Sequence, residues 1–299
     1  MWRRPCGPSG RMRSMPIRPC VRWANWIRKL PRLSCRMPCV LSKHRSRSMK
    51  ILFAGTGAAD YDWSRYGEPG IMGSTATLID DSILIDCGPS AAAALKRFGV
   101  DYSGITHIVV THNHSDHFNL DSLKTIAQGN KIDLFGPAAV CDKARPYCAS
   151  VHELDYGSRF RAGNYEFLTL PSNHTVTDIF EKTFLYLITG RDRTLLYALD
   201  TAWFPTLAYR LLGKTYLNGV IWDATMSEPG NWRIFEHTDP VMFAMMRRTL
   251  TENGNLDENT RIWFDHRART LWPAEPAEQE KITQRENVLL AHDGETVIL

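Results

Sequence analysis

The chain has 299 residues, of which 43% are hydrophobic and 23% charged, the balance of an ordinary globular protein. It contains no apolar run near the roughly 18 residues that a membrane-spanning helix needs. The formal net charge of +4 is unevenly distributed, because residues 1–48 hold 13 of the 36 Lys and Arg and none of the 32 acidic residues. The remainder is therefore acidic, which argues against a long surface that follows nucleic-acid phosphates.

Residues 1–48 differ in kind from the rest of the chain. They are rich in Arg, Pro, Cys and Trp and show no helical or strand periodicity. A transit segment, a basic arm and a stretch upstream of the true start at Met49 are the three interpretations. We favour the start at Met49, because MKILFAGTGAAD begins like a first strand and its turn. The sequence thus predicts a disordered basic extension at 1–48 and one domain at 49–299. The scattered cysteines of that domain indicate buried thiols in a reducing cytoplasm.

From Met49 onward, short β-like runs alternate with turns and amphipathic segments. A first strand is predicted at 50–54, followed by Gly55-Thr56-Gly57. A hairpin is predicted around Asp80-Asp81, and then a helix over 90–98 with Ser90 as its N-cap. The β-branched run 105–110 predicts another strand.

The second half of the chain continues this alternation. Strands are predicted at 132–135, 165–170, 184–188, 194–199, 218–222 and 261–264, helices at 119–127 and 240–250, and a C-terminal hairpin at 288–291 and 295–299 with the turn Asp293-Gly294. Many short strands with interspersed helices predict two sheets covered by helices.

The densest group of potential metal ligands is THNHSDH at residues 111–117, directly after the predicted strand 105–110. His112 and His114 are two residues apart on an extended segment, so both can reach one metal ion. Asp116 and His117 then turn toward a second position. Imidazole and carboxylate suit zinc, manganese or iron without any thiolate. A polar surface loop is the alternative, and the full spacing disfavours it.

This spacing resembles the His-x-His-x-Asp-His signature of the metallo-β-lactamase fold superfamily. The resemblance implies an α/β fold, an αβ/βα four-layer sandwich of two mixed β-sheets flanked by helices, with two divalent metal ions at one edge of the sheets. Asp86 is similar to the family's supporting aspartate beneath the site. By the same resemblance, the first metal takes His112, His114 and His174, the second takes Asp116, His117 and His266, and Asp200 and a hydroxide are shared between them.

Three features resemble the phosphodiesterase branch of this superfamily, which includes tRNA 3′-processing endonucleases and cyclic phosphodiesterases. They are the opening Gly-Thr-Gly loop, Asp200, and Trp-Asp-Ala-Thr at 222–225 followed by His237-Thr238-Asp239. The resemblance implies that His237 assists the departing oxygen. Because carboxylates commonly orient histidines, we expect Asp239 to orient His237, so His237, Asp239 and Asp116 are the predicted catalytic residues. The alternative is that His237 merely precedes a helix that Thr238 or Asp239 caps.

The chain also departs from these relatives. It shows no counterpart of the long arm of the tRNA-processing enzymes, and residues 60–70 lack the cysteines of the cyclic phosphodiesterase zinc loop. We therefore expect a cytoplasmic metal-dependent hydrolase that cleaves a small or cyclic phosphodiester with two Zn²⁺ or Mn²⁺ ions. Neither long nucleic acid nor a membrane is an expected partner, and a homodimer is left open. A lactonase or thioesterase on the same centre, or a non-catalytic metal-binding protein, is the alternative.

Overall fold

The computed structural model describes residues 48–299 and places their strands in two seven-stranded sheets. The predictions made for residues 1–47 lie outside the described part. Within that part, no helix has the length and apolar character needed to cross a bilayer.

The first sheet has the strand order β14-β1-β2-β3-β4-β5-β6. Its strands from β14 to β3 pair antiparallel and those from β3 to β6 pair parallel. The predicted hairpin is confirmed, because Asp80 and Asp81 both adopt positive φ between β2 and β3. The strands are β1 (Lys50–Gly55), β2 (Ala76–Ile79), β3 (Ile83–Ile85), β4 (His107–Val109), β5 (Asp133–Gly136), β6 (Ser150–Glu153) and β14 (Thr296–Ile298).

The second sheet has the order β13-β12-β11-β10-β9-β8-β7, antiparallel from β7 to β10 and parallel from β10 to β13. Its strands are β7 (Arg159–Ala162), β8 (Tyr165–Pro171), β9 (Phe184–Gly190), β10 (Arg193–Ala198), β11 (Gly219–Asp223), β12 (Arg261–Asp265) and β13 (Leu289–Leu290).

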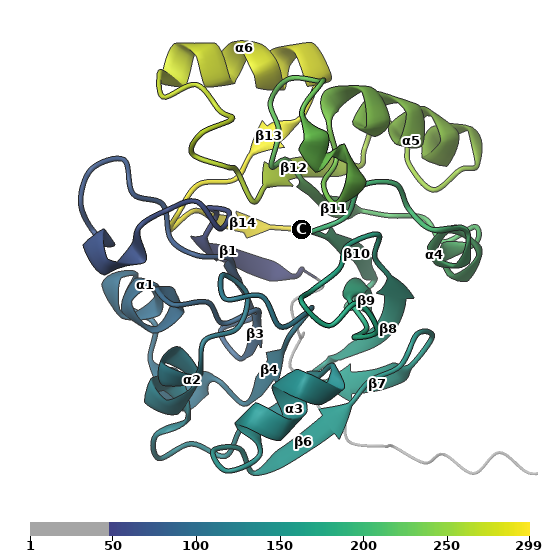
Figure 1. Cartoon of the computed structure of the whole chain (residues 1–299). Helices are drawn as coiled ribbons and strands as arrows, with labels where there is room; N and C mark the ends of the chain where they lie inside the picture. Colours follow the sequence, from purple (N-terminus) through teal and green to yellow (C-terminus); the bar gives the residue numbers. More distant parts are fainter. Residues whose placement is uncertain (1–47) are drawn as a thin grey trace, which may run out of the picture. The chain divides into compact units, whose positions relative to one another are not determined.

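Helices cover the outer faces of both sheets (Figure 1). The first sheet packs its outer face on α1 (Ala91–Arg97), α2 (Leu120–Ala127) and α3 (Ala138–Ala144), and the second on α4 (Thr206–Leu212), α5 (Pro240–Glu252) and α6 (Pro276–Glu286). The short 3₁₀ helices are η1 (Trp63–Arg65), η2 (Tyr102–Gly104) and η3 (Trp232–Phe235).

The central core lies between the two sheets. Phe53 of the first sheet and Tyr186, Tyr197 and Trp263 of the second have no exposed surface there. Burying side chains of this size stabilises the fold by roughly 1.5–3 kcal/mol each, so this layer holds the sheets together. The predicted αβ/βα sandwich is confirmed.

Two local predictions differ from the structure. The C-terminal strands do not form a hairpin, because β13 pairs with β12 in one sheet and β14 pairs with β1 in the other. The Asp293-Gly294 turn instead carries the chain from one sheet to the other. Ser90 does stand at the N-cap position of α1, but its side chain makes no capping hydrogen bond and accepts one from the backbone N–H of Ser74.

The strands that carry the candidate ligands end at one edge of the sandwich. Residues in the left-handed region mark three of these ends, namely Asp86 after β3 (φ 61°), Asp200 after β10 (φ 50°) and His266 after β12 (φ 62°). Non-glycine residues seldom adopt this conformation and do so mainly where the surrounding structure enforces it. The backbone therefore turns sharply at the three places where a polar side chain has to leave the sheet.

Candidate metal centre

The loop that follows β4 carries four of the candidate ligands, and residues beyond β3 hold it in place. The backbone N–H of Cys87 donates to the carbonyl of His117, and that of Asn119 donates to the carbonyl of Cys87. A Cβ at Gly88 would lie 2.1 Å from the carbonyl oxygen of Asp116, so only glycine allows these two segments to approach so closely. The loop is thus held in place by contacts within the chain.

The first set of candidate ligands comprises His112, His114 and His174, which we call the three-histidine group. Nδ1 of His114 lies 3.1 Å from Nε2 of His112 and 2.9 Å from Nε2 of His174. Oδ2 of Asp200 lies 3.1 Å from Nε2 of His112 and 3.5 Å from Nε2 of His174. These four ligand atoms converge closely enough to hold one metal ion.

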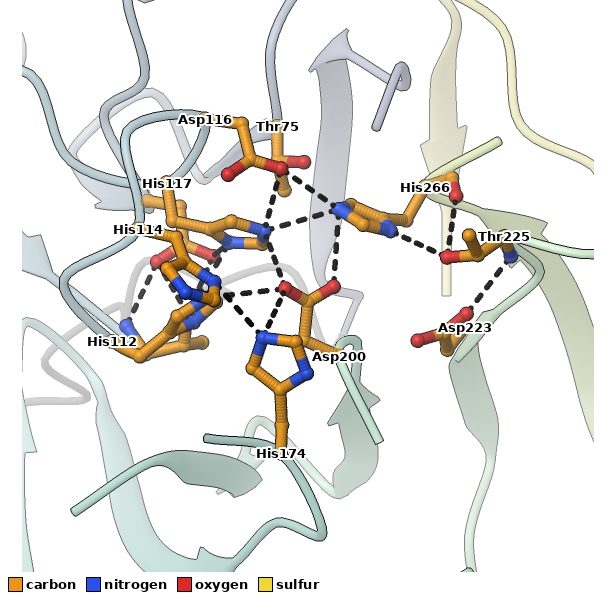
Figure 2. A network of polar contacts seen from close by, with 12 residues as sticks. Thr75, His112, His114, Asp116, His117, His174, Asp200, Asp223, Thr225 and His266 are labelled. Atoms are coloured by element: carbon orange, nitrogen blue, oxygen red, sulfur yellow. Dashed lines mark hydrogen bonds and ion pairs between the residues drawn. The ribbon is translucent and has the colours of Figure 1, made fainter. Parts of the chain in front are cut away.

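The second set comprises Asp116, His117 and His266, which we call the aspartate group. Nε2 of His117 lies 3.1 Å from Nε2 of His266, and Oδ2 of Asp116 lies 3.2 Å from that same nitrogen of His266. Asp200 contacts this set too, with Oδ2 3.1 Å from Nε2 of His117 and Oδ1 3.0 Å from Nε2 of His266. Asp200 therefore stands between both groups, as Figure 2 shows.

The ligand atoms of both groups are better suited to bind divalent cations than to form hydrogen bonds with one another. When the rings are neutral, His112 and His174 use their protons on Thr111 and on the Glu236 carbonyl, so only His114 can carry a proton between the facing nitrogens. Oδ1 of Asp200 is buried and accepts no hydrogen bond of acceptable geometry. Imidazole and carboxylate are the donors that Zn²⁺ and Mn²⁺ accept, and each group with Asp200 supplies four.

In the loop histidines His112 and His117, the ring nitrogen that points away from the ligand site has a hydrogen-bond partner. Nδ1–H of His117 donates to Oδ2 of Asp86 at 2.8 Å, and Nδ1–H of His112 donates to Oγ1 of Thr111 at 2.9 Å. Thr111 in turn donates its hydroxyl to Asp86, which also accepts from the Thr111 backbone N–H. This network directs Nε2 of both rings toward the ligand site.

The two histidines of the second sheet are oriented in the same way. Nδ1–H of His174 donates to the carbonyl of Glu236 at 3.3 Å. Nδ1–H of His266 donates to Oγ1 of Thr225 at 2.9 Å, and the Thr225 hydroxyl donates to the backbone carbonyl of His266. Each ring thus presents Nε2 to the site.

The electrostatics of the two groups differ. Burial lowers the pKa of His112, His114 and His174 below the usual 6.5. The pull of the Asp200 carboxylate does not overcome this effect. The three-histidine group is therefore neutral at pH 7 and offers its lone pairs without first losing a proton.

Burial also opposes charge on His117 and His266, but nearby carboxylates outweigh it. Asp200 and Asp116 hold the pKa of His117 well above its ordinary value and raise the pKa of His266 to about 9. In return, His117 and His266 keep the pKa of both carboxyls below the usual range despite their burial. The aspartate group is therefore an ion-pair network in which protons occupy positions that a cation would take.

His237 lies beside these groups, and the carboxylate that orients it belongs to Asp223. Its Nδ1–H donates to Oδ2 of Asp223 at 2.8 Å, and its ring stacks on that of His266 with centroids 5.5 Å apart. The prediction that Asp239 orients His237 is wrong. Asp239 instead accepts from the backbone N–H of Met242 and caps α5. Burial opposes charge on His237, but Asp223 outweighs it and raises its pKa above the usual value.

The structure thus brings all seven predicted ligands and His237 together at one site. The sequence analysis missed three residues that orient the histidines. Asp223 and Thr225 belong to the Trp-Asp-Ala-Thr motif noted in the sequence, where their spacing of two places both on one side of the strand end. Glu236 acts through its backbone carbonyl, for which no side-chain pattern exists.

A cavity of about 270 Å³ opens onto the ligands. Asp60, Asp116, Asp200 and Glu236 supply its carboxylates, and Arg233 is the only Lys or Arg among the described residues that line it. Such a volume admits a small substrate or the end of a larger one.

Comparison with known proteins places this architecture in a family. Residues 81–250, more than half of the chain, match the model of the family described as the beta-lactamase superfamily domain. The chain therefore belongs to the beta-lactamase superfamily. It is a hydrolase of the metallo-β-lactamase fold with clusters of His and Asp that can hold divalent metal ions.

Two curated relatives match over short stretches. The chain is 30% identical over 79 residues to Ribonuclease Z of Alkaliphilus oremlandii, which covers 25% of either protein. It is 33% identical over 99 residues to the anti-Pycsar protein Apyc1 of Paenibacillus xerothermodurans, which covers 31% of this chain and 37% of that one. The match thus spans only about a quarter to a third of these relatives.

Solved structures share the fold over most of the chain. The metallo-beta-lactamase fold protein YhfI from Bacillus subtilis has a TM-score of 0.66 at 14% identity, covering 84% of this chain and 100% of that one. A diphosphatase from the PhnP family reaches 0.63 at 17%, covering 84% and 97%. Human short-form tRNase Z reaches 0.57 at 19%, covering 83% and 98%.

Proposed function

We propose that this hydrolase is a dinuclear phosphodiesterase that acts on a small or cyclic phosphodiester. The observation that carries the proposal is the position of the His237–Asp223 pair beside two ligand groups that share Asp200. An imidazole whose Nδ1–H is held by a carboxylate can deliver a proton from Nε2. An alkoxide needs this help because it is a poor leaving group, and general acids of this kind contribute about 10²–10⁴ in rate.

The residues around the site then have separate tasks. Two divalent cations, Zn²⁺ or Mn²⁺, bound by the two groups would offset charge on the phosphate and lower the pKa of a water to roughly 7. Asp200 fixes the two groups relative to each other, Asp86 orients His117, and Thr225 orients His266. Their hydrogen bonds hold the ligand nitrogens in place before substrate arrives, which avoids reorganisation during the reaction.

The relatives and the cavity support the choice of substrate. Ribonuclease Z is by name a nuclease, and the anti-Pycsar protein and a PhnP-family diphosphatase lie in the same superfamily or fold. Arg233 alone among the described Lys and Arg lines the cavity, which favours a small molecule over long nucleic acid. The described cysteines are free thiols, in keeping with the proposed cytoplasmic location.

The test is an activity panel on purified protein of measured metal content, loaded in parallel with Zn²⁺ or Mn²⁺. Bis-p-nitrophenyl phosphate and cyclic phosphodiesters are compared with lactones and thioesters, each for the unmodified protein and for His112→Ala. We expect kcat/KM for phosphodiesters to exceed that for the other esters, and we expect His112→Ala to abolish it.

Two results would reject the proposal. Faster turnover of lactones or thioesters would identify a carboxylic ester hydrolase on the same centre. A fully metal-loaded protein that is inert on the whole panel would identify a non-catalytic metal-binding protein.

A further inference from the structure

Arg233 lies in η3, and the backbone of this short helix is tied to the metal site. The carbonyl of Arg233 accepts hydrogen bonds from the backbone N–H groups of His237 at 2.8 Å and Glu236 at 2.9 Å. The side chain of Asn231 accepts from the Arg233 N–H, and the carbonyl of Glu236 accepts from the ring of His174. The backbone position of Arg233 is therefore set by the same contacts that orient the histidines.

Arg233 lines the cavity and has no carboxylate partner among the described residues. It is half-buried and lines the cavity, yet no carboxylate among the described residues lies within ion-pair distance of it. Residues 1–47 cannot supply one from a side chain, because they contain neither Asp nor Glu. Other arginines of the domain, such as Arg65 and Arg159, do pair with a glutamate. A half-exposed guanidinium with no internal partner keeps its N–H donors free for an anion that enters the cavity.

Trp232 packs against this guanidinium. The indole ring lies 5.1 Å from the guanidinium carbon and is itself 67% exposed. Such a cation–π contact limits the directions that the planar fork can take without using any of its N–H donors. The free donors suit an oxygen anion such as phosphate or carboxylate, which arginine can bind through two parallel hydrogen bonds.

Glu236 is the carboxylate closest to Arg233 along the chain, and it is engaged elsewhere. Its carboxylate groups with ring nitrogens of His174 and His237, all within 4.8 Å of one another. It forms no ion pair with Arg233, although both residues belong to the same short segment and line the same cavity. The arginine is thus available to an incoming ligand.

We propose that Arg233 binds a second anionic group of the substrate, a phosphate or carboxylate separate from the phosphodiester that is cleaved. The preferred substrate is then a phosphodiester that carries one further anionic group. This inference rests on the proposed phosphodiesterase function for its catalytic test, but the binding of the second anion is independent of turnover.

The catalytic test compares two phosphodiesters that differ only in a terminal phosphomonoester against a hydroxyl. Unmodified protein is expected to favour the phosphorylated member in kcat/KM. Arg233→Ala is expected to lower its kcat/KM by about 10- to 100-fold, mainly through KM, because a hydrogen bond to a charged group contributes about 1.5–3 kcal/mol. The hydroxyl member should change less than 2-fold, roughly. Arg248→Ala removes an exposed guanidinium from α5 and serves as the matched control.

A binding test separates failure of this inference from failure of the proposed function. Calorimetry on the metal-loaded protein compares propane-1,3-diol bisphosphate with propyl phosphate. We expect Arg233→Ala to weaken only the bisphosphate, by roughly 10-fold or more. If both ligands weaken equally, or neither does, Arg233 is not a second-anion site, whatever the enzyme hydrolyses. If the bisphosphate alone weakens while no phosphodiester is cleaved, the anion site stands and the proposed reaction is wrong.

Discussion

The three-histidine group and the aspartate group contact the same carboxylate of Asp200, but the pKa values of their histidines are shifted in opposite directions. The first consists of imidazoles whose pKa burial lowers, and the second contains two imidazoles whose pKa neighbouring carboxylates raise. The first can accept a cation as it stands, whereas the second has to release protons first. Two metal positions built from similar residues are thus chemically unequal.

The assembly of the two groups is nevertheless the same. Each takes two ligands from the loop after β4 and one histidine from an end of a strand in the second sheet, His174 beyond β8 or His266 after β12. Neither group is complete until the two sheets have packed together. Metal binding therefore depends on the packing of the central core as well as on the structure of the loop.

The largest effect is expected at the residue that joins the groups. Asp200→Asn keeps the size of the side chain but removes the charge that both groups share, so we expect loss of both metal ions. Turnover should fall by more than about 10²–10³-fold, which is the usual loss when one hydrogen-bond donor to a transition state is removed. Elemental analysis and kcat measured on the same preparation test this expectation.

His112→Ala is the matched variant for Asp200→Asn, because it removes a ligand of the three-histidine group alone. It should lower the metal content by one ion, and circular dichroism should show that both variants keep the fold. Retention of two ions in Asp200→Asn would show that the groups do not depend on a common carboxylate.

The next effect concerns the side of the site from which the leaving group departs. The ring of His237 lies beside a ligand of each group, with centroids 5.1 Å from His174 and 5.5 Å from His266, so we expect the departing oxygen to lie where the two groups meet. His237→Ala should slow substrates with alkoxide leaving groups by about 10²–10⁴-fold and p-nitrophenolate much less. Rate measurements over a leaving-group series test this prediction.

Two aspartates distinguish orientation of His237 from helix capping. Asp223→Ala should reproduce the leaving-group dependence of His237→Ala, since Asp223 accepts the Nδ1–H of His237. Asp239→Ala should instead lower the free energy of unfolding by about 1 kcal/mol through loss of the α5 cap. A leaving-group effect in Asp239→Ala, but not in Asp223→Ala, would restore the role that the sequence predicted.

The sequence predicted ligands well where they are contiguous and partners poorly where they are distant. The cluster at 111–117 is visible because four ligands follow one strand, and the resemblance supplied the remainder in order. The partner of His237 was misassigned because Asp239 is near in the chain, whereas Asp223 reaches it across the end of β11. The C-terminal strands were mispaired for the same reason, since a turn motif does not show that the chain changes sheets.

The residues behind the ligands should have intermediate effects that differ between the groups. Thr225→Val removes the acceptor for Nδ1–H of His266 in nearly the same volume, and we expect a 10- to 100-fold loss of metal affinity at the aspartate group, roughly. Thr225→Ser keeps the hydroxyl and should restore it. Competition with a metal-binding dye measures both. If Thr225→Val weakens the three-histidine group equally, the hydroxyl has a general structural role.

The smallest and most gradual effect is the pH dependence of the two metal positions. Because the pKa of His266 is raised to about 9, a cation entering the aspartate group below pH 9 has to displace protons. Its apparent affinity should therefore fall about 10-fold per pH unit for each proton displaced, from pH 9 downward. The three-histidine group, whose pKa values burial lowers, should lose affinity only at lower pH than the aspartate group. Metal content at equilibrium with a buffered chelator should thus fall first by one ion on acidification, whereas loss of both ions with the same slope would show that the two groups titrate as one.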